Sequence, residues 1–325
     1  MSPRSLEIDV HPPWPYRLPA GGGGDGVGRV RGGVFSRLLC LGEERVVVAA
    51  WQRRGGEVAL RATASPDRPH PAPAVLELAI ERMRFALAVD DDLTEFHRAF
   101  RADPLIGPAI SRRPWYRPRR RPFAWEALAW AVTKQLIESG RAAEIQRRMV
   151  RRWGATATSP FPPGWTLRAV PDPATMAARS PAELASTDLS AGRSLAMIRV
   201  AREVAAGRAD PADPADDPRL RRISEIGPWT LQCLGLYGRG EPDSLPAGDL
   251  GYVKLVGRLA GLRRRATVEE VDEYFAPYAP FRGLAGEFAL RHYHAGMQVR
   301  SFSSESSVSG RRRRPQVVPR GAPGA

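Results

Sequence analysis

A turn at Gly227-Pro228 constrains the fold of this chain more than any other feature of its sequence. Ile223 and Ile226 end one apolar segment just before it. Gly227 can take a positive φ, and Pro228 suits the first position of a helix that continues from Trp229 to Tyr237. The pattern predicts a hairpin between two helices. The free N–H groups and positive dipole end at the start of the second helix favour an anion, so the backbone there can bind a phosphate.

The segment after this hairpin can return a carboxylate to it. Gly238 ends the second helix, which is about 15 Å long at about 1.5 Å per residue. The loop from Arg239 to Gly248 can span roughly 33 Å when extended, so Asp249 can lie beside the hairpin. Apolar residues then recur at helical spacing at Leu250, Val253, Val256 and Leu259. Asp249 is therefore predicted at or near the N-cap of the next helix.

Three motifs in the C-terminal two thirds of the chain belong together. They are Ile226-Gly227-Pro228-Trp229-Thr230 with Pro246-Ala247-Gly248-Asp249, the run from Pro122 to Ile137, and Asp188 to Arg193 with the helix after it. These motifs resemble the helix-hairpin-helix DNA glycosylase superfamily, and within it the bacterial 3-methyladenine DNA glycosylase II type. The resemblance covers about residues 90–295 and is weaker over the N-terminal region.

The resemblance implies a reaction and a catalytic residue. The substrate would be an alkylated purine, 3-methyladenine or 7-methylguanine, flipped out of duplex DNA and released by hydrolysis. The carboxylate of Asp249 would stabilise positive charge on the sugar and activate water while the N-glycosidic bond breaks. An N-cap role for Asp249 is the alternative, and the two roles are compatible. A base-excision repair enzyme that acts on one lesion at a time is expected to be a monomer.

The resemblance also implies further site residues. The DNA backbone would contact the hairpin residues Ile226, Gly227, Pro228 and Thr230, whose carbonyls would hold a monovalent cation although no side chain demands one. Gln135 and Leu136 would form the wedge that fills the gap left by the flipped nucleotide, with a core position for Leu136 as the alternative. The damaged base would contact the aromatic residues Trp229, Tyr237 and Tyr252.

Trp229 decides the expected subtype of enzyme. Bifunctional relatives have a lysine at the corresponding position, and its amine attacks the sugar. Without that amine a Schiff base cannot form, so the resemblance implies a monofunctional glycosylase that leaves an abasic site. An aromatic ring also suits an electron-poor, cationic base, with core packing as the alternative role of Trp229.

Two positions depart from the family pattern. Glu225 stands where the hairpin usually has glycine, which puts a negative side chain near the expected phosphate. Lys134-Gln135 replaces the family's Gln-Gln pair. Two other functions therefore remain open, a glycosylase for a deaminated or oxidised base and a DNA-binding paralogue that does not cleave.

The N-terminal residues predict a different architecture from the rest. Strands are expected at Leu6 to Val10, Val34 to Leu41, Arg45 to Trp51 and Val58 to Ala62, in an antiparallel sheet covered by a helix bearing Leu76, Ile80, Met83 and Leu87. The glycines between residues 21 and 28 lack the features of a phosphate-binding loop and predict a flexible hairpin loop. A Pro-rich loop is expected between Trp153 and Pro173.

The expected fold class is therefore α+β. Residues 1–89 form a small N-terminal α+β module, and residues 90–300 form a helical glycosylase domain of two lobes with the active-site cleft between them. Residues 301–325, rich in Ser, Arg, Pro and Gly, predict a disordered basic tail.

Composition agrees with a polyanionic partner. The 325 residues carry a formal net charge of +14, although only Lys134 and Lys254 among the 49 basic residues are lysines. The two cysteines cannot supply a four-cysteine iron–sulfur cluster or a four-ligand zinc site, so no such cofactor is expected. We see no secretory signal or membrane-spanning run, and cytoplasmic localisation is the expectation.

Overall fold

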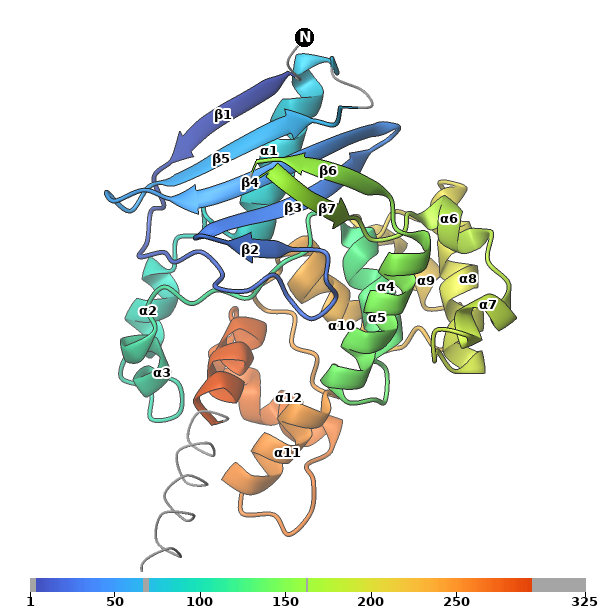
Figure 1. The fold of residues 1–325 in the computed structure, drawn as a ribbon. Helices are drawn as coiled ribbons and strands as arrows, with labels where there is room; N and C mark the ends of the chain where they lie inside the picture. The colour runs from blue at the N-terminus through green and yellow to red at the C-terminus, as the bar shows by residue number, and fades with distance from the viewer. Residues whose placement is uncertain (1–3, 67–69, 162, 294–325) are drawn as a thin grey trace, which may run out of the picture.

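The N-terminal part of the chain folds as an antiparallel sheet. The computed structural model describes residues 4–66, 70–161 and 163–293, and within them five strands pair in the order β1-β5-β4-β3-β2 (Figure 1). The strands are β1 (Ser5–Val10), β2 (Arg29–Arg31), β3 (Val34–Leu41), β4 (Glu44–Gln52) and β5 (Val58–Ala64). The four predicted strands are confirmed. Strand β2 was not predicted because Val30 is its only apolar residue.

One face of this sheet is covered by helix α1 (Pro73–Leu87). Leu76, Ile80 and Met83 are each at most 4% exposed and pack against apolar residues of the sheet, as the helical spacing predicts. Burial of each such side chain contributes roughly 1.5–3 kcal/mol, so this layer is a principal source of stability for the N-terminal module.

A short β-hairpin covers the opposite face of the sheet (Figure 1). It consists of β6 (Thr156–Pro160) and β7 (Pro163–Arg168), and its Leu167 packs with Leu38 and Val47 of the sheet. The prediction of a Pro-rich loop here was wrong. Pro160 and Pro163 lie at the strand ends of this two-stranded hairpin, where a missing N–H is tolerated.

The glycine-rich loop near residue 25 makes buried contacts that were not predicted. Asp25 is 3% exposed, accepts a hydrogen bond from Trp130 Nε1 at 2.9 Å and pairs with Arg121. Val27 is fully buried in the core of the helical body. The prediction of a flexible loop was therefore wrong, because one buried carboxylate attaches it to the helical body.

A first helical lobe is built around one apolar core. Its helices are α4 (Ala124–Lys134), α5 (Ser139–Trp153), α6 (Pro173–Ala177), α7 (Pro181–Ala185), α8 (Ala191–Ala205), α9 (Asp217–Leu220) and α10 (Pro228–Leu234). A 3-10 turn η1 (Pro214–Asp216) precedes α9, and α10 continues as a π-helical turn η2 (Gly235–Arg239). Together α10 and η2 form the predicted second helix of the hairpin.

A second lobe brings together helices from both ends of the body. It contains α2 (Thr94–Phe100), α3 (Gly107–Arg112), α11 (Leu250–Leu259), α12 (Val268–Phe275), the 3-10 turn η3 (Ala276–Tyr278) and a helix at residues 282–293. Phe96 of α2 and Phe288 of the last helix pack with a ring-centre distance of 5.3 Å. The core of this lobe is therefore formed by segments that lie far apart in the sequence.

The expected fold class is confirmed, a small N-terminal antiparallel sheet followed by a helical body. The hairpin β6–β7 is the exception within that body. In the described residues we find no helix that is both long and apolar enough to span a membrane. The tail predicted at residues 301–325 lies outside the described residues.

Candidate active site

A cavity lies where the two helical lobes meet. Its volume is about 220 Å³, and its walls come from the segment before α4, from α4, from α10 and η2, and from the helix at 282–293. The lining residues are Tyr116, Arg119, Arg121, Ala127, Trp130, Ala131, Lys134, Cys233, Tyr237, Glu287 and Arg291. The site is thus assembled from four segments spread over about half of the chain.

Glu287 is held in the cavity wall by two phenols. Tyr116 Oη donates to Glu287 Oε2 at 2.5 Å, and Tyr237 Oη donates to Oε1 at 2.6 Å. Burial raises the pKa of both tyrosines well above the usual value, and the neighbouring Glu287 carboxylate adds to that shift. Both phenols therefore remain hydrogen-bond donors at neutral pH. Tyr237 lines the cavity as predicted, while Tyr116 and Glu287 were not predicted as site residues.

Lys134 brings an amine into the same cavity. This exposed residue lines the cavity, and its Nζ lies 5.9 Å from the ring centre of Tyr237. Desolvation, followed by the nearby Arg121 guanidinium, lowers the pKa of Lys134. Cys233, Glu287 and Asp249 act in the opposite direction. Asp249 therefore lies close enough to the cavity to interact electrostatically with this amine.

Asp249 occupies the predicted N-cap of α11. Its Oδ1 accepts a hydrogen bond from Gly251 N at 2.8 Å, and the residue is half-buried. The preceding Gly248 packs on the hairpin, since a Cβ built there would lie 3.7 Å from Trp229 Cδ1. The loop therefore returns to the hairpin as its length predicted. The indole Nε1 of Trp229 is buried and has no partner among the described residues.

The hairpin turn differs from the prediction in one backbone angle. Gly227 has φ −97° and ψ −177°, an extended N-cap conformation that other residues also adopt, so it does not use the positive φ that glycine permits. The positive φ belongs to Glu225, at 74°. This conformation costs an L-residue about 1–2 kcal/mol, which is a physical reason to place glycine there. Pro228 is the first residue of α10, as predicted.

The Glu225 side chain points toward the start of α8. A Cβ built on Gly192, the second residue of that helix, would lie 3.5 Å from Glu225 Oε1. The positive dipole end of α8 is a favourable place for a carboxylate. Glu225 therefore has a favourable site for its charge at α8.

Gln135 is placed differently from the wedge prediction. Its side chain is 9% exposed, and Nε2 donates to the Glu225 carbonyl at 2.5 Å and to Thr230 Oγ1 at 3.0 Å. Gln135 thus fastens the end of α4 to the hairpin instead of projecting. Thr230 is 1% exposed and Ile226 is 4% exposed, so neither side chain is free to contact DNA.

Leu136 projects fully from the surface. It is 102% exposed and has φ 56°, so the chain turns sharply at the end of α4. Arg193 Nη1 supports this turn by donating to the carbonyls of Thr133 at 3.0 Å and Gln135 at 3.4 Å. The alternative of a core position for Leu136 is excluded, and its role as wedge stays a prediction.

Tyr252 is a core residue rather than a cavity residue. It is 1% exposed and meets Phe275 edge to face at 5.8 Å between ring centres. Its position on α11 turns the ring into the second lobe, away from the cavity lining. The structure therefore corrects the prediction that Tyr252 contacts the base.

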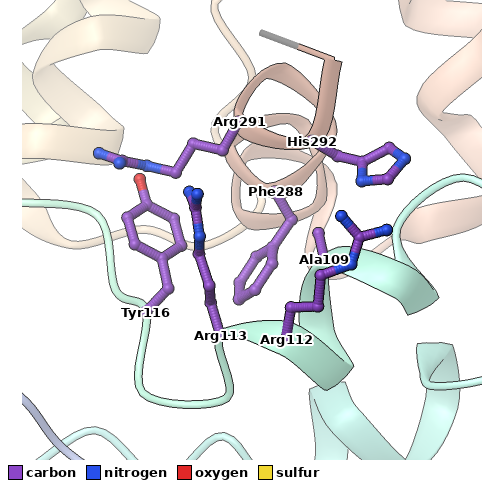
Figure 2. A pocket seen from close by; sticks show the side chains of 7 residues that line it. All are labelled: Ala109, Arg112, Arg113, Tyr116, Phe288, Arg291 and His292. Carbon is purple, nitrogen blue, oxygen red and sulfur yellow. The ribbon is translucent and has the colours of Figure 1, made fainter. Parts of the chain in front are cut away.

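A shallow basic groove adjoins the cavity (Figure 2). Arg112, Arg113, Arg291 and His292 line it around Phe288, as Figure 2 shows. The groove and the cavity share Tyr116 and Arg291, and the Arg291 guanidinium lies 4.0 Å from the ring centre of Tyr116. A basic surface therefore continues from the cavity outward.

Three arginines in the segment before α4, Arg117, Arg120 and Arg121, have structural partners. Arg117 is buried and donates to the carbonyls of Pro15 and Asp91, and Arg120 pairs with the Asp91 carboxylate at 2.6 Å. Arg121 pairs with Asp25. Arg117 and Arg120 thus hold the fold together, while Arg121 both pairs with Asp25 and lines the cavity.

Comparison with known proteins agrees with this geometry. No protein-family model matches the sequence. A DNA-3-methyladenine glycosylase of Bacillus subtilis is 25% identical over 209 residues, which cover 62% of this chain and 68% of that protein. A probable bifunctional transcriptional activator/DNA repair enzyme AlkA of Mycobacterium tuberculosis is 27% identical over 221 residues, 65% of this chain and 42% of that protein.

The fold is shared with a solved structure. The 3-methyladenine DNA-glycosylase from Archaeoglobus fulgidus superposes with a TM-score of 0.74 at 18% identity, covering 88% of this chain and 97% of that one. The fold and the Asp249 loop beside the hairpin define a helix-hairpin-helix protein. The chain is thus similar in sequence to a DNA-3-methyladenine glycosylase and in fold to the 3-methyladenine DNA-glycosylase from Archaeoglobus fulgidus, in agreement with the resemblance seen in its motifs.

Proposed function

We propose that this protein releases alkylated purines, 3-methyladenine and 7-methylguanine, from duplex DNA by hydrolysis of the N-glycosidic bond. The observation that carries the proposal is the return of the loop before Asp249 to the hairpin, with Asp249 close enough to interact electrostatically with Lys134 in the cavity wall. The name of the Bacillus subtilis relative, DNA-3-methyladenine glycosylase, supports 3-methyladenine as a substrate.

The proposed mechanism assigns one step to each part of the site. The hairpin backbone and the basic groove bind phosphates, and Leu136 fills the space left by the flipped nucleotide. The base enters the cavity while Asp249 stabilises the positive charge that develops on the sugar and directs water to C1′. The N-cap bond from Gly251 holds the carboxylate in place for this task. These steps call for no metal or organic cofactor.

Base loss is proposed to use water as the nucleophile. Trp229 occupies the α10 position at which bifunctional relatives carry an amine, so no covalent bond from α10 can form. The indole instead covers the loop before Asp249 through its contact with Gly248.

A second substrate class is favoured by the charge of the cavity. Arg119, Lys134 and Arg291 line it, and Glu287 is the carboxylate that faces them from the lining. Such a wall repels a cationic methylated purine and attracts a neutral base with carbonyl acceptors. A deaminated or oxidised purine is therefore the alternative substrate of the same reaction.

The decisive experiment measures free base released from duplexes that contain one lesion each. Wild type and Asp249→Asn would be assayed on 7-methylguanine and on a deaminated purine, and strand breaks counted separately after alkali. The proposal expects release of the methylated base that is lost in Asp249→Asn. Release of the neutral base alone would favour the second substrate class. A folded wild type that binds DNA but releases no base would be a binding protein.

A matched variant tests the charge argument directly. Arg119→Gln removes one cavity charge and leaves Lys134 and Asp249 in place. The ratio of methylated to neutral base release should rise in this variant. An unchanged ratio would show that the cavity charge does not select the base.

A further inference from the structure

One carboxylate faces the cavity among positively charged side chains. Glu287 lies on the helix at 282–293, is half-buried, and lines the cavity together with two arginines at its rim and a lysine. Within the described residues, its hydrogen bonds come from the phenols of Tyr116 and Tyr237 rather than from these cations. The proposed base release gives this carboxylate no task, because Asp249 is the group assigned to the sugar.

The two phenols fix the positions of both carboxylate oxygens. Tyr116 Oη donates to Glu287 Oε2 at 2.5 Å, and Tyr237 Oη donates to Oε1 at 2.6 Å. Tyr116 precedes α4 and Tyr237 lies in η2, so two separate segments hold the carboxylate. A carboxylate oxygen has two lone pairs, so each one keeps an acceptor site after its bond to a phenol. Glu287 therefore offers two adjacent acceptors at a fixed place in the cavity wall.

Hydrogen-bond donors lie beside these two acceptors. Arg291 is one turn after Glu287 on the same helix, and its guanidinium lies 4.0 Å from the ring centre of Tyr116 (Figure 2). The charge of Glu287 acts to raise the pKa of Lys134, so that amine is within electrostatic range of the carboxylate. The cavity thus presents a pair of acceptors flanked by cationic donors.

A guanine base has the complementary edge. Its N1–H and its exocyclic 2-amino group are adjacent donors, and O6 beside them is an acceptor. A carboxylate accepts from both donors together, and a neighbouring cation donates to O6. An adenine does not match, because its N1 is an acceptor and would place a lone pair against a carboxylate oxygen.

We propose that Glu287 is a specificity-determining residue that selects guanine lesions over adenine and hypoxanthine lesions. The inference rests on the proposed base release and adds the edge of the base that the cavity recognises. Methylation at N7 leaves N1–H and the 2-amino group in place, so 7-methylguanine keeps both donors, whereas 3-methyladenine has neither. This selection depends on the pattern of hydrogen bonds and not on the positive charge that both methylated purines carry in DNA.

The test compares two lesions of equal charge, 7-methylguanine and 7-methylhypoxanthine, which differ only in the 2-amino group. Base release from duplexes with one lesion each is divided by the rate of spontaneous loss. Wild type should favour 7-methylguanine roughly tenfold, because the other base lacks one hydrogen bond to a charged group. Glu287→Gln replaces one acceptor by an N–H donor and should bring this ratio close to one. The matched control is Glu273→Gln, which neutralises an exposed carboxylate of α12 and should keep the wild-type ratio.

Binding gives a second readout that needs no catalysis. Asp249→Asn should bind the 7-methylguanine duplex roughly tenfold more tightly than the 7-methylhypoxanthine duplex, and adding Glu287→Gln should make the two affinities equal.

Two results would overturn the inference. One is a lesion ratio near one in both readouts for proteins that retain Glu287, which does not depend on how any Glu287 variant folds. The other is a wild-type ratio that persists in Glu287→Gln. Either result together with base release by wild type would leave the proposed function standing. No release of either base, with a binding ratio that Glu287→Gln abolishes, would contradict the proposed function alone.

Discussion

Replacement of Gln135 by leucine tests whether this side chain fixes the hairpin. Gln135 Nε2 makes two hydrogen bonds, to the Glu225 carbonyl and to Thr230 Oγ1. Each hydrogen bond contributes about 1 kcal/mol net to stability. The Thr230 hydroxyl is 1% exposed, so water cannot replace the lost partner, and leaving it unpaired costs about 1 kcal/mol more. Gln135 Oε1 is buried without a partner, so its removal returns about 1 kcal/mol. Gln135→Leu should therefore destabilise the fold by about 2 kcal/mol.

Urea unfolding gives this value and a double-mutant cycle assigns it. Combined with Thr230→Val, Gln135→Leu should show a coupling of about 1 kcal/mol, because the two residues share a hydrogen bond. Leu136→Ala is the control, since this neighbouring side chain is fully exposed and its loss should leave stability within about 0.5 kcal/mol of wild type. A Gln135→Leu protein as stable as wild type, or a cycle with no coupling, would refute the role of Gln135 in holding the hairpin.

Three further predictions concern catalysis, DNA distortion and pH. Asp249→Asn keeps an N-cap, so its free energy of unfolding should match that of wild type while base release falls roughly 100-fold or more. Asp249→Ala should lose base release and also about 1 kcal/mol of stability. Equal base release by Asp249→Asn and wild type would leave Asp249 with the capping role alone. Leu136→Ala should slow base release from duplex roughly tenfold, the equivalent of about 1.4 kcal/mol, and a rate like that of wild type would argue against the wedge. Burial raises the pKa of Asp25, but Arg121, Arg37 and the Trp130 hydrogen bond outweigh it and lower the pKa from 3.8 to about 2. The Asp25 carboxylate therefore contributes roughly 2 kcal/mol to stability above pH 4, and this contribution should be lost as the pH falls through about 2. Urea unfolding at several pH values should show that Asp25→Asn lacks this part of the acid dependence.

Local patterns predicted the parts of the site that depend on short stretches of chain. Pro228 begins a helix because its fixed φ suits that position, and Asp249 caps the next helix because its side chain accepts from Gly251 N. The length of the intervening loop showed that Asp249 can lie beside the hairpin, and in the structure the preceding Gly248 packs on Trp229. These predictions needed only backbone preferences and reach.

Side-chain direction was not predictable in the same way. Gln135 and Leu136 are neighbours on one turn, yet one binds the hairpin and the other is fully exposed, because Leu136 takes a positive φ and turns the chain. Tyr237 and Tyr252 were both predicted to contact the base, but only Tyr237 lines the cavity. Such differences of one side chain are fixed by tertiary packing rather than by spacing.

The hydrogen bond between Glu287 and Tyr116 could not be predicted from local sequence patterns, because the two residues lie far apart in the chain. The two residues are 171 positions apart and meet only when the helix at 282–293 packs on the segment before α4. The available sequence signal was a single carboxylate, Glu287, within the apolar run from Leu284 to Leu290, because a carboxylate on the apolar face of a helix is expected to have hydrogen-bond donors nearby.

The charge of the cavity wall depends on the proton of Lys134. A protonated Lys134 adds a positive charge to a wall that already holds Arg119 and Arg291, and that charge repels a cationic methylated purine. Desolvation, followed by the Arg121 guanidinium, lowers the pKa of Lys134, so this amine loses its proton at a lower pH than a free lysine does. A neutral Lys134 removes its own part of the repulsion. The rate of release of a cationic base relative to a neutral base should therefore rise as the pH increases through the pKa of this amine, and a ratio that does not change with pH would show that Lys134 does not select the base.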